Sequence, residues 1–291
     1  MRKKGRCYWV YNLRYVSDTG RTIRLGYPYG TLADLDPLAG IEVDIATSQG
    51  FQQTGETVEN LSVGGVERQI SGLIIGDANE IKRQMLQIFA PGTGGRLYFN
   101  DRYYCDAVVK SVPEISVKRK NATYVIVLYC AYPYWKGATD KGYRLGGYTP
   151  AFRFPVNYSI PHIFGVKSTN AYTNCTNDGA VAVPFAAEFR AAAEAEHYGL
   201  INVNTLEELM INDTLTTGET VRIYRQNGRL FLEKTSGGVT ESIFYALDEE
   251  SDLFLIRPGD NLLMPQADSG SEHLTVTVSF ADTYPGVYDG M

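Results

Sequence analysis

The residues able to do acid–base or metal chemistry are few and widely separated. The three histidines are His162, His197 and His273. None of them stands four residues from another, or beside cysteines at metal-ligand spacing, so the pattern does not indicate a zinc site. The four cysteines also lack metal-like spacing and fall mostly within apparent strands, which predicts buried free thiols. They are Cys7, Cys105, Cys130 and Cys175.

Other patterns of catalytic interest are incomplete. Carboxylates cluster at Glu207-Glu208 and between Asp248 and Asp252. A glycosidase needs an acid and a base on opposite sides of a bond, and these runs are more typical of solvated surfaces. The Gly92–Gly95 turn lacks the Lys-Ser/Thr end of a phosphate-binding loop, and no G-x-S-x-G elbow occurs. We therefore expect a protein that is not an enzyme, with no cofactor and no metal.

Composition indicates an ordinary globular chain of about two domains. Of its 291 residues, 44% are hydrophobic and 21% charged, and tyrosine is abundant, with 21 residues. Tyrosine favours sheets and is also enriched at subunit contacts. Residues 1–155 carry 20 basic and 14 acidic residues, whereas residues 156–291 carry 7 and 19. This asymmetry predicts two domains with different neighbours, and no basic run is dense enough to predict sequence-specific binding of nucleic acid.

No targeting or membrane signal is complete. Met1–Lys4 resembles the start of a signal peptide, but the apolar run Cys7–Tyr11 is too short for one. The longest apolar run, Tyr124–Tyr132, cannot span a bilayer. These features predict synthesis in the cytoplasm and no membrane insertion.

A single helix is expected among strands. Asp77 is a good N-cap, Glu80 stands at the capping-box position, and Pro91-Gly92 predicts a stop, so the helix should cover about 77–89. Strands are expected around it, with Pro133 and Trp135 closing the series; they are Leu73–Ile75, Arg96–Asn100, Tyr103–Lys110 and Tyr124–Tyr132.

The second half reads as short strands separated by turns. Phe185–His197 is rich in alanine, yet its charged residues fall on even positions, which predicts a half-buried strand. Phe244–Ala246 is expected to be a strand. Arg257–Asn261 is expected to be a turn between two apolar strands within Leu253–Pro265. Lys136–Pro161 has little periodicity and is expected to be a linker or arm.

The predicted fold is therefore mainly β. It comprises an N-terminal β-sandwich domain at 1–135 with one short helix, an arm at 136–161, and a C-terminal β-sandwich at 162–291. Tyr27–Gly40 is expected to be an ordered loop, because it is rich in glycine, proline and aspartate.

The order of elements from Gly72 to Trp135 resembles the distal tail protein family of long-tailed bacteriophages and prophage-derived tail particles. The residues that carry this resemblance are Asp77, Glu80, Pro133 and Trp135, together with the later Pro258, Gly259, Asp260 and Asn261. The resemblance implies a C-terminal domain similar to galectins or carbohydrate-binding modules.

The same resemblance implies a structural protein of the virion tail tip or baseplate. It would form a ring, hexameric in the family, that joins the tail tube to the host-recognition apparatus. Its implied partners are the tail tube protein, the tape measure protein, the tail-associated hub or lysin, and receptor-binding proteins.

An alternative interpretation is a module that binds cell-wall glycans and has no assembly role. Tyr198, Tyr224 and Tyr245 would then stack on sugars from one concave face. For the ring, Tyr27–Gly40 and Lys136–Pro161 are the expected sites of subunit contact, because long loops on a β scaffold commonly build contacts.

Overall fold

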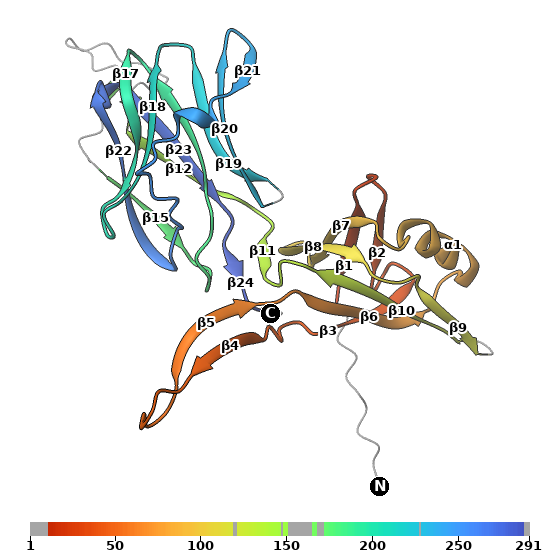
Figure 1. Cartoon of the computed structure of the whole chain (residues 1–291). Coiled ribbons are helices and arrows are strands. Elements are labelled where there is room, and N and C mark those ends of the chain that lie inside the picture. The colour runs from red at the N-terminus through yellow and green to blue at the C-terminus, as the bar shows by residue number, and fades with distance from the viewer. Residues whose placement is uncertain are drawn as a thin grey trace. The chain divides into compact units, whose positions relative to one another are not determined.

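The computed structural model describes residues 11–118, 121–146, 148–150, 165–167, 172–226 and 228–287. The chain divides into two compact units. Unit 1 comprises Met1–Thr139 and Thr283–Met291, and unit 2 comprises Asp140–Asp282 (Figure 1). Strands dominate both units, and one α-helix lies in the described part, which confirms the predicted fold class.

Unit 1 is built on one ten-stranded antiparallel sheet. Its main path is β2-β1-β7-β8-β10-β6-β3, with β9 paired to β10, β11 to β8 and β24 to β11. The terminal strands β2 and β3 also contact each other, so the expected sandwich takes the form of a single sheet curved over one core. The bounds are β1 Leu13–Ser17, β2 Thr22–Leu25, β3 Thr31–Asp36, β6 Val66–Ile74, β7 Gly94–Phe99, β8 Tyr103–Val109, β9 Glu114–Lys118, β10 Asn121–Cys130, β11 Trp135–Gly137 and β24 Thr283–Tyr284.

The helix forms within the predicted range of about 77–89, with Asp77 as its N-cap. Helix α1 covers Ala78–Ile88, and the Asp77 carboxylate accepts hydrogen bonds from the backbone N–H of Asn79 and Glu80, at 3.0 and 3.2 Å. Glu80 does not complete a capping box in the described contacts. Its carboxylate instead accepts from Arg83 and Gln84, because an i+3 or i+4 partner lies on the same helix face.

The expected loop Tyr27–Gly40 contains a strand, which corrects that prediction. In β3 the residues Thr31, Ala33 and Leu35 are buried, whereas Asp34 and Asp36 are exposed. This is the alternation of a half-buried strand, and β3 pairs with β6 along its whole length. The surrounding glycines and prolines concealed this short alternating run.

Unit 2 is a sandwich of two sheets over a common core. One sheet has the order β12-β23-β16-β19-β20-β21 and the other β15-β22-β17-β18. A separate pair, β13 and β14, completes the unit. The bounds are β12 Lys141–Gly146, β13 Tyr148–Pro150, β14 Gly165–Lys167, β15 Thr173–Asn177, β16 Ala186–Ala191, β17 Ala195–Asn202, β18 Glu207–Leu215, β19 Thr220–Gln226, β20 Arg229–Ser236, β21 Val239–Ser242, β22 Gly259–Ser269 and β23 Leu274–Phe280. The similarity to galectins stays a prediction.

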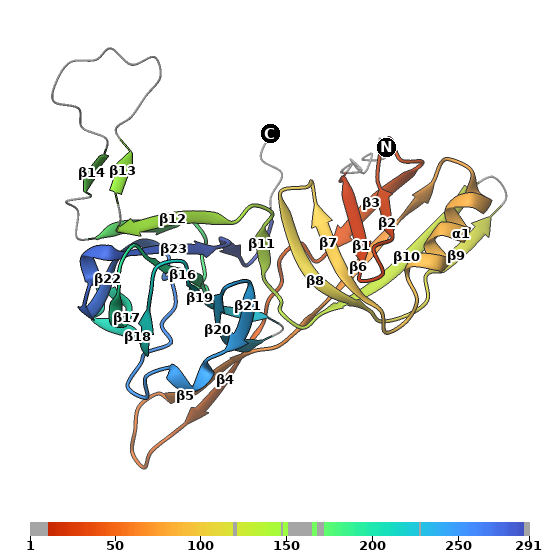
Figure 2. The same ribbon diagram turned by 90° about the horizontal axis from the view of Figure 1, so that it is seen from above.

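Most of the described residues of the expected arm belong to strands. Residues 135–137 form β11, and residues 141–146 form β12, which lies alongside β23 (Figure 2). The chain therefore passes from unit 1 to unit 2 at Thr139–Asp140, and Thr283–Tyr284 returns to unit 1 as β24. Residues 151–161 of the expected arm lie outside the described residues. Sheet pairing, which composition does not reveal, decides these boundaries.

Three local predictions in unit 2 need correction. Phe185–His197 is two strands, β16 and β17, separated by a short break, although the period of two within β16 is as predicted. Phe244–Ala246 is a turn of 3₁₀ helix, η1, and not a strand. Residues 251–255 form no strand, whereas Gly259, Asp260 and Asn261 begin β22. No described helix combines the length and the apolar character that a bilayer crossing needs.

Gly72 offers a test of the curved sheet. A Cβ atom there would lie 1.8 Å from the backbone oxygen of Leu32, on the facing strand. Gly72→Ala should lower the free energy of unfolding by roughly 1–3 kcal/mol or more, because backbone atoms cannot yield as a side chain can. Gly64→Ala, where a Cβ meets no atom within 4 Å, is the control. Urea unfolding measures both, and equal stability of the two variants would contradict the register between β3 and β6.

Candidate functional site

A two-stranded hairpin projects from unit 1 and forms a sheet of its own. Its strands are β4, Val43–Ser48, and β5, Thr57–Val63. They connect β3 to β6 and extend beyond the curved sheet (Figure 1). Every residue of both strands is exposed, so neither face of this hairpin is covered by the rest of the described part of unit 1.

One face of the hairpin is apolar. Val43 pairs with Val63, Ile45 with Leu61, and Thr47 with Val58 after a bulge. Because directly opposed residues share a face, the side chains of Val43, Ile45, Val58, Leu61 and Val63 form one stripe, here called the hairpin apolar face. The opposite face is polar, with Asp44 paired to Ser62, Ala46 to Asn60 and Ser48 to Thr57.

The apolar face is unusually open to solvent. Ile45 and Leu61 are 59% and 60% exposed, and Phe51 at the tip is 97% exposed. A lone two-stranded hairpin is marginally stable in water, and a continuous exposed apolar surface marks an interaction site. The hairpin apolar face is therefore a candidate interaction site.

A buried arginine holds the base of the hairpin. Arg68 is fully buried, and its guanidinium donates hydrogen bonds to the carbonyl oxygens of Pro37 and Pro133, the latter at 2.7 Å. It also lies over the Trp135 ring, 4.4 Å from the centroid. The Trp135 indole N–H donates to the carbonyl oxygen of Leu38 at 3.0 Å. The segment that leads into β4 is thus fixed to β6 and to the start of β11.

The residues that carried the family resemblance fall in three places. Pro133 and Trp135 meet at this base, whereas Asp77 and Glu80 lie at the start of α1. The Pro258–Asn261 segment lies in unit 2. There the buried Asn261 amide donates to the carbonyl oxygens of Arg257, at 2.7 Å, and Gly259, at 3.1 Å. These residues support local structure, and the structure does not gather them into one site.

Asp260 faces the neighbouring strand β15. Its carboxylate accepts from the Thr176 hydroxyl at 2.9 Å. Hydrogen bonds from Asn174 and Thr176 lower the pKa of Asp260 below its usual value. The carboxylate therefore stays ionised and ties β22 to β15.

His197 is better connected than its isolation in the sequence suggested. Its ring nitrogens lie 2.9 Å from Asp268 and 3.1 Å from Asp248. The hydrogen bond with Asp268, followed by that with Asp248, raises the pKa of His197. This half-buried bridge ties the segment after η1 to β17 and β22. His162 lies outside the described residues, and His273 lies 3.3 Å from Glu272.

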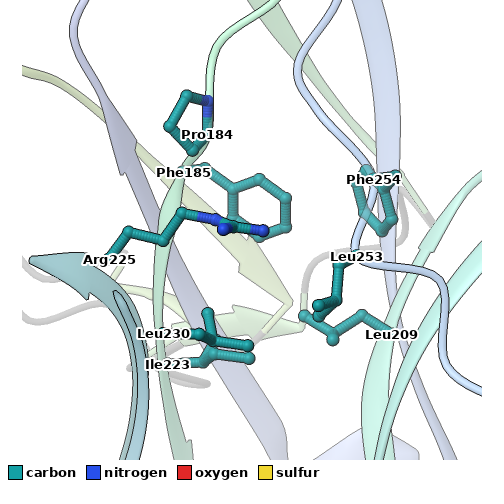
Figure 3. A pocket seen from close by; sticks show the side chains of 8 residues that line it. All are labelled: Pro184, Phe185, Leu209, Ile223, Arg225, Leu230, Leu253 and Phe254. Atoms are coloured by element: carbon teal, nitrogen blue, oxygen red, sulfur yellow. The ribbon is translucent and has the colours of Figure 1, made fainter. Parts of the chain in front are cut away.

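Unit 2 also has a small apolar pocket between its sheets (Figure 3). Its volume of about 20 Å³ holds little more than one water molecule, far below the several hundred cubic ångströms of typical ligand sites. The one charged side chain around it is that of Arg225. The lining residues are Pro184, Phe185, Leu209, Ile223, Arg225, Leu230, Leu253 and Phe254.

The three tyrosines proposed for sugar stacking do not share a face. Tyr198 is fully buried in the core against Phe189, with ring centroids 5.6 Å apart. Tyr224 of β19 stacks on Phe231 at 5.3 Å, and Tyr245, in η1, is 86% exposed. Among the described residues, no group of three or more His, Cys, Asp or Glu side chains could hold a metal ion.

Sequence reasoning did not single out the hairpin as a contact surface. The alternation of Val43 and Ile45 with Asp44 and Ala46 was a visible strand signal. Alternation alone does not tell whether the apolar face is covered by the same chain or by another.

The Arg68 anchor can be tested by a change that keeps the charge. Arg68→Lys should lower the free energy of unfolding of unit 1 by about 2–4 kcal/mol, because lysine cannot reach two carbonyls and stack on Trp135 together. The exposed Arg102→Lys is the control and should change stability by less than about 0.5 kcal/mol. Chemical denaturation measures both, and an Arg68→Lys variant as stable as the parent would contradict the anchor.

His197 predicts a pH-dependent contribution to stability. Its folded-state pKa is raised, so the stabilisation is complete below the unfolded pKa of about 6.5 and is lost as pH rises through the folded pKa. His197→Asn should therefore destabilise unit 2 at pH 5.5, by less than about 1 kcal/mol given its partial exposure, and by less at pH 9. Thermal unfolding at both pH values, with His273→Asn as the control, measures this. A pH-independent difference would contradict the bridge.

Comparison with known proteins gives one match to a family model and several matches to solved structures. Residues 178–284 match the family model described as "Siphovirus-type tail component, C-terminal domain". None of the curated proteins matches the sequence of this chain.

Among solved structures, the Dit protein of phage SPP1 is similar at 12% identity with a TM-score of 0.64. The match covers 92% of this chain and 98% of that one, and that protein is described as a paradigm of hub adsorption apparatus in phages that infect Gram-positive bacteria. A chain of the activated phage p2 baseplate with strontium is similar at 9% identity and a TM-score of 0.50, covering 94% and 98% of the two chains. The same baseplate with calcium gives 9% identity, a TM-score of 0.50, and coverage of 93% and 98%.

These matches confirm the resemblance read from the sequence. The match with the SPP1 protein has a TM-score of 0.64 and covers 92% of this chain, so both units share the architecture of that protein. The protein has the fold of a distal tail protein, and its C-terminal unit matches the siphovirus-type tail component family.

Proposed function

We propose that this protein is a structural subunit of a phage tail tip or baseplate, and that it assembles into a closed ring. The observation that carries the proposal is the hairpin apolar face, which the described part of unit 1 leaves uncovered. The family match of the C-terminal unit and the fold shared with the SPP1 protein support a place in the virion tail.

A second copy of the chain is the proposed occupant of the hairpin apolar face. The hairpin is one element at one edge of unit 1, so a neighbour that received it elsewhere on its surface would form a head-to-tail contact. Such contacts close into rings when the rotation between subunits permits. A ring of six is proposed from the resemblance to the family.

The ring would join the tail tube to the host-recognition apparatus. Unit 1 would contact the tail tube protein and surround the tape measure protein, and unit 2 would hold the hub or lysin and the receptor-binding proteins. The acidic balance of residues 156–291 would favour partner surfaces that carry positive charge.

Glycan binding by unit 2 has less support. Sugar sites place aromatic rings on one accessible face, and Tyr198, Tyr224 and Tyr245 do not form such a face. The pocket in Figure 3 is also too small for a sugar ring. Assembly is therefore the function that the geometry supports best.

Substitutions on the two faces of the hairpin test the ring. Ile45→Asp combined with Leu61→Asp should weaken self-association by at least about 30-fold, because a charge would replace each of two apolar contacts at the centre of the interface. The matched control, Asn60→Asp on the polar face, should assemble as the parent does. Light scattering and sedimentation at two concentrations measure the mass of each.

The unfolding midpoint of each variant shows whether a loss of assembly comes from a lost contact or from a loss of folding. All hairpin strand residues are exposed, so the substitutions should leave the unfolding midpoint of the monomeric units unchanged. A parent protein that is monomeric at every concentration would contradict the ring. So would a loss of assembly in the Asn60→Asp variant as large as that in the variant with Ile45→Asp and Leu61→Asp. A parent that stops at a dimer would indicate a two-fold contact instead.

A further inference from the structure

Two buried cysteines of unit 1 lie side by side. Cys105 of β8 and Cys130 at the end of β10 are both fully buried, and their Sγ atoms are 3.6 Å apart. Cys175 in unit 2 is also buried and free, and it has no thiol beside it among the described cysteines. The spacing of 25 positions between Cys105 and Cys130 gave no sign of this pair in the sequence.

The sheet leaves room for these sulfur atoms to approach. Along one edge of β8, Val108 and Val109 pair with β10, whereas Tyr103 and Tyr104 pair with β11. Cys105 lies where the partner strand changes, and Cys130 lies one residue beyond the last β10 residue paired to β8. A disulfide has sulfurs about 2.0 Å apart, so a closure of roughly 1.5 Å is needed. No β8–β10 ladder pair joins the two cysteines, so this closure breaks no such pair.

A fixed positive charge lies beside the pair. Arg68 stands opposite Leu128 on the neighbouring strand β6, and Leu128 and Cys130 share the buried face of β10. The Arg68 guanidinium has no carboxylate ion pair among the described residues, and its buried Nε atom has no hydrogen-bond partner. A thiolate at Cys130 would therefore lie beside a cation whose only described partners are neutral groups, and an adjacent arginine favours the thiolate, which is the nucleophilic form of cysteine.

The acidity of the two thiols points the same way. The hydrogen bond with Cys105 and then the charge of Arg68 lower the pKa of Cys130, against the opposing effect of burial. The hydrogen bond with Cys130 and burial raise the pKa of Cys105. Cys130 is thus the nucleophile that attacks first, and Cys105 is the thiol that attacks the oxidised Cys130 in the second step.

We propose that Cys105 and Cys130 are a site of oxidative modification, at which a small peroxide converts the thiol pair into a disulfide. The Cys130 thiolate attacks one oxygen of hydrogen peroxide, so that an S–O bond forms, the O–O bond breaks and hydroxide leaves. Cys105 then gives up its proton and attacks the Cys130 sulfur, so that the S–S bond forms, the S–O bond breaks and a second hydroxide leaves. The protons from the two thiols convert the two hydroxides into water. Two thiols and one peroxide become one disulfide and two waters, with two electrons passing from sulfur to oxygen.

The modification would strengthen unit 1 where its hairpin is anchored. The disulfide would close the chain from β8 to the end of β10, three residues before Pro133, and so next to the carbonyl that Arg68 holds. This inference goes beyond assembly and is independent of it, because it concerns chemistry inside unit 1. A particle outside a reducing cell meets oxidants that the cytoplasm removes.

Mass spectrometry of the oxidised full-length protein tests the site. In a Cys7→Ser background the chain holds three thiols, and stoichiometric hydrogen peroxide should lower its mass by about 2 Da, with one cross-linked peptide pair joining Cys105 to Cys130. Cys175, whose pKa burial raises to about 12, is the internal control and should oxidise at least about 10-fold more slowly. The unfolding midpoint should rise by on the order of 10 °C and fall back with a reductant.

Two variants make the outcome decisive. Cys105→Ala should abolish the cross-link and leave Cys130 to oxidise further to sulfinic acid, whereas Cys175→Ser should form the cross-link at the parental rate. The proposal is overturned if Cys105 and Cys130 stay reduced while Cys175 reacts. It is equally overturned if the parent's pair goes to sulfinic acids without a cross-link, because that result needs no closure of the sulfurs. If Cys105→Ala fails to fold, the parent protein still shows whether Cys105 and Cys130 form the cross-link or go to sulfinic acids.

Discussion

The structure of unit 1 depends on a buried positive charge that no described carboxylate neutralises. Taking a guanidinium out of water costs several kcal/mol unless dipoles replace the solvent. Here the carbonyl oxygens of Pro37 and Pro133 and the face of Trp135 replace it. These groups come from two separate stretches, one at Pro37 and one at Pro133–Trp135, and Arg68 itself lies on a third, β6. Solvating the charge therefore requires all three stretches to be in place. The compensation of Arg68 thereby sets where the hairpin leaves the sheet and where β11 begins.

In unit 2, neutral side-chain amides fix the segments that join the strands. The Asn177 side chain donates to the carbonyl oxygens of Val181 and Ile256, and Asn261 binds the turn before β22. Each amide donates to backbone carbonyl oxygens of segments that join the strands, and buried polar groups of this kind are costly when unpaired. Irregular segments are thus held by buried polar side chains, Arg68 in unit 1 and Asn177 and Asn261 in unit 2, while the regular strands rely on apolar packing. Rigid bases of this kind are suited to presenting surfaces to other subunits, because the presented element costs little further ordering on binding.

The predictions that succeeded were those based on local chemistry. Asp77 caps the helix because an N-cap acts over three residues. Alternation in Phe185–Ala191 outweighed alanine's helix propensity, as β16 shows. The predictions that failed needed partners distant in the chain. β3 and β12 were expected to be loop and arm, and only pairing with β6 and β23 makes them strands.

The sequence by itself determined the class of fold, the single helix with its cap, and a pattern of elements specific enough to indicate the family. It did so because capping, turn conformation and the period of apolar residues act between neighbours. Tertiary structure alone decided that Cys105 meets Cys130, that His197 bridges two aspartates, and that the hairpin apolar face stays uncovered. Each of these depends on residues brought together by strand order, and strand order follows from the global packing of the sheet. A period of two shows that a strand has an apolar face, and the fold decides what covers it.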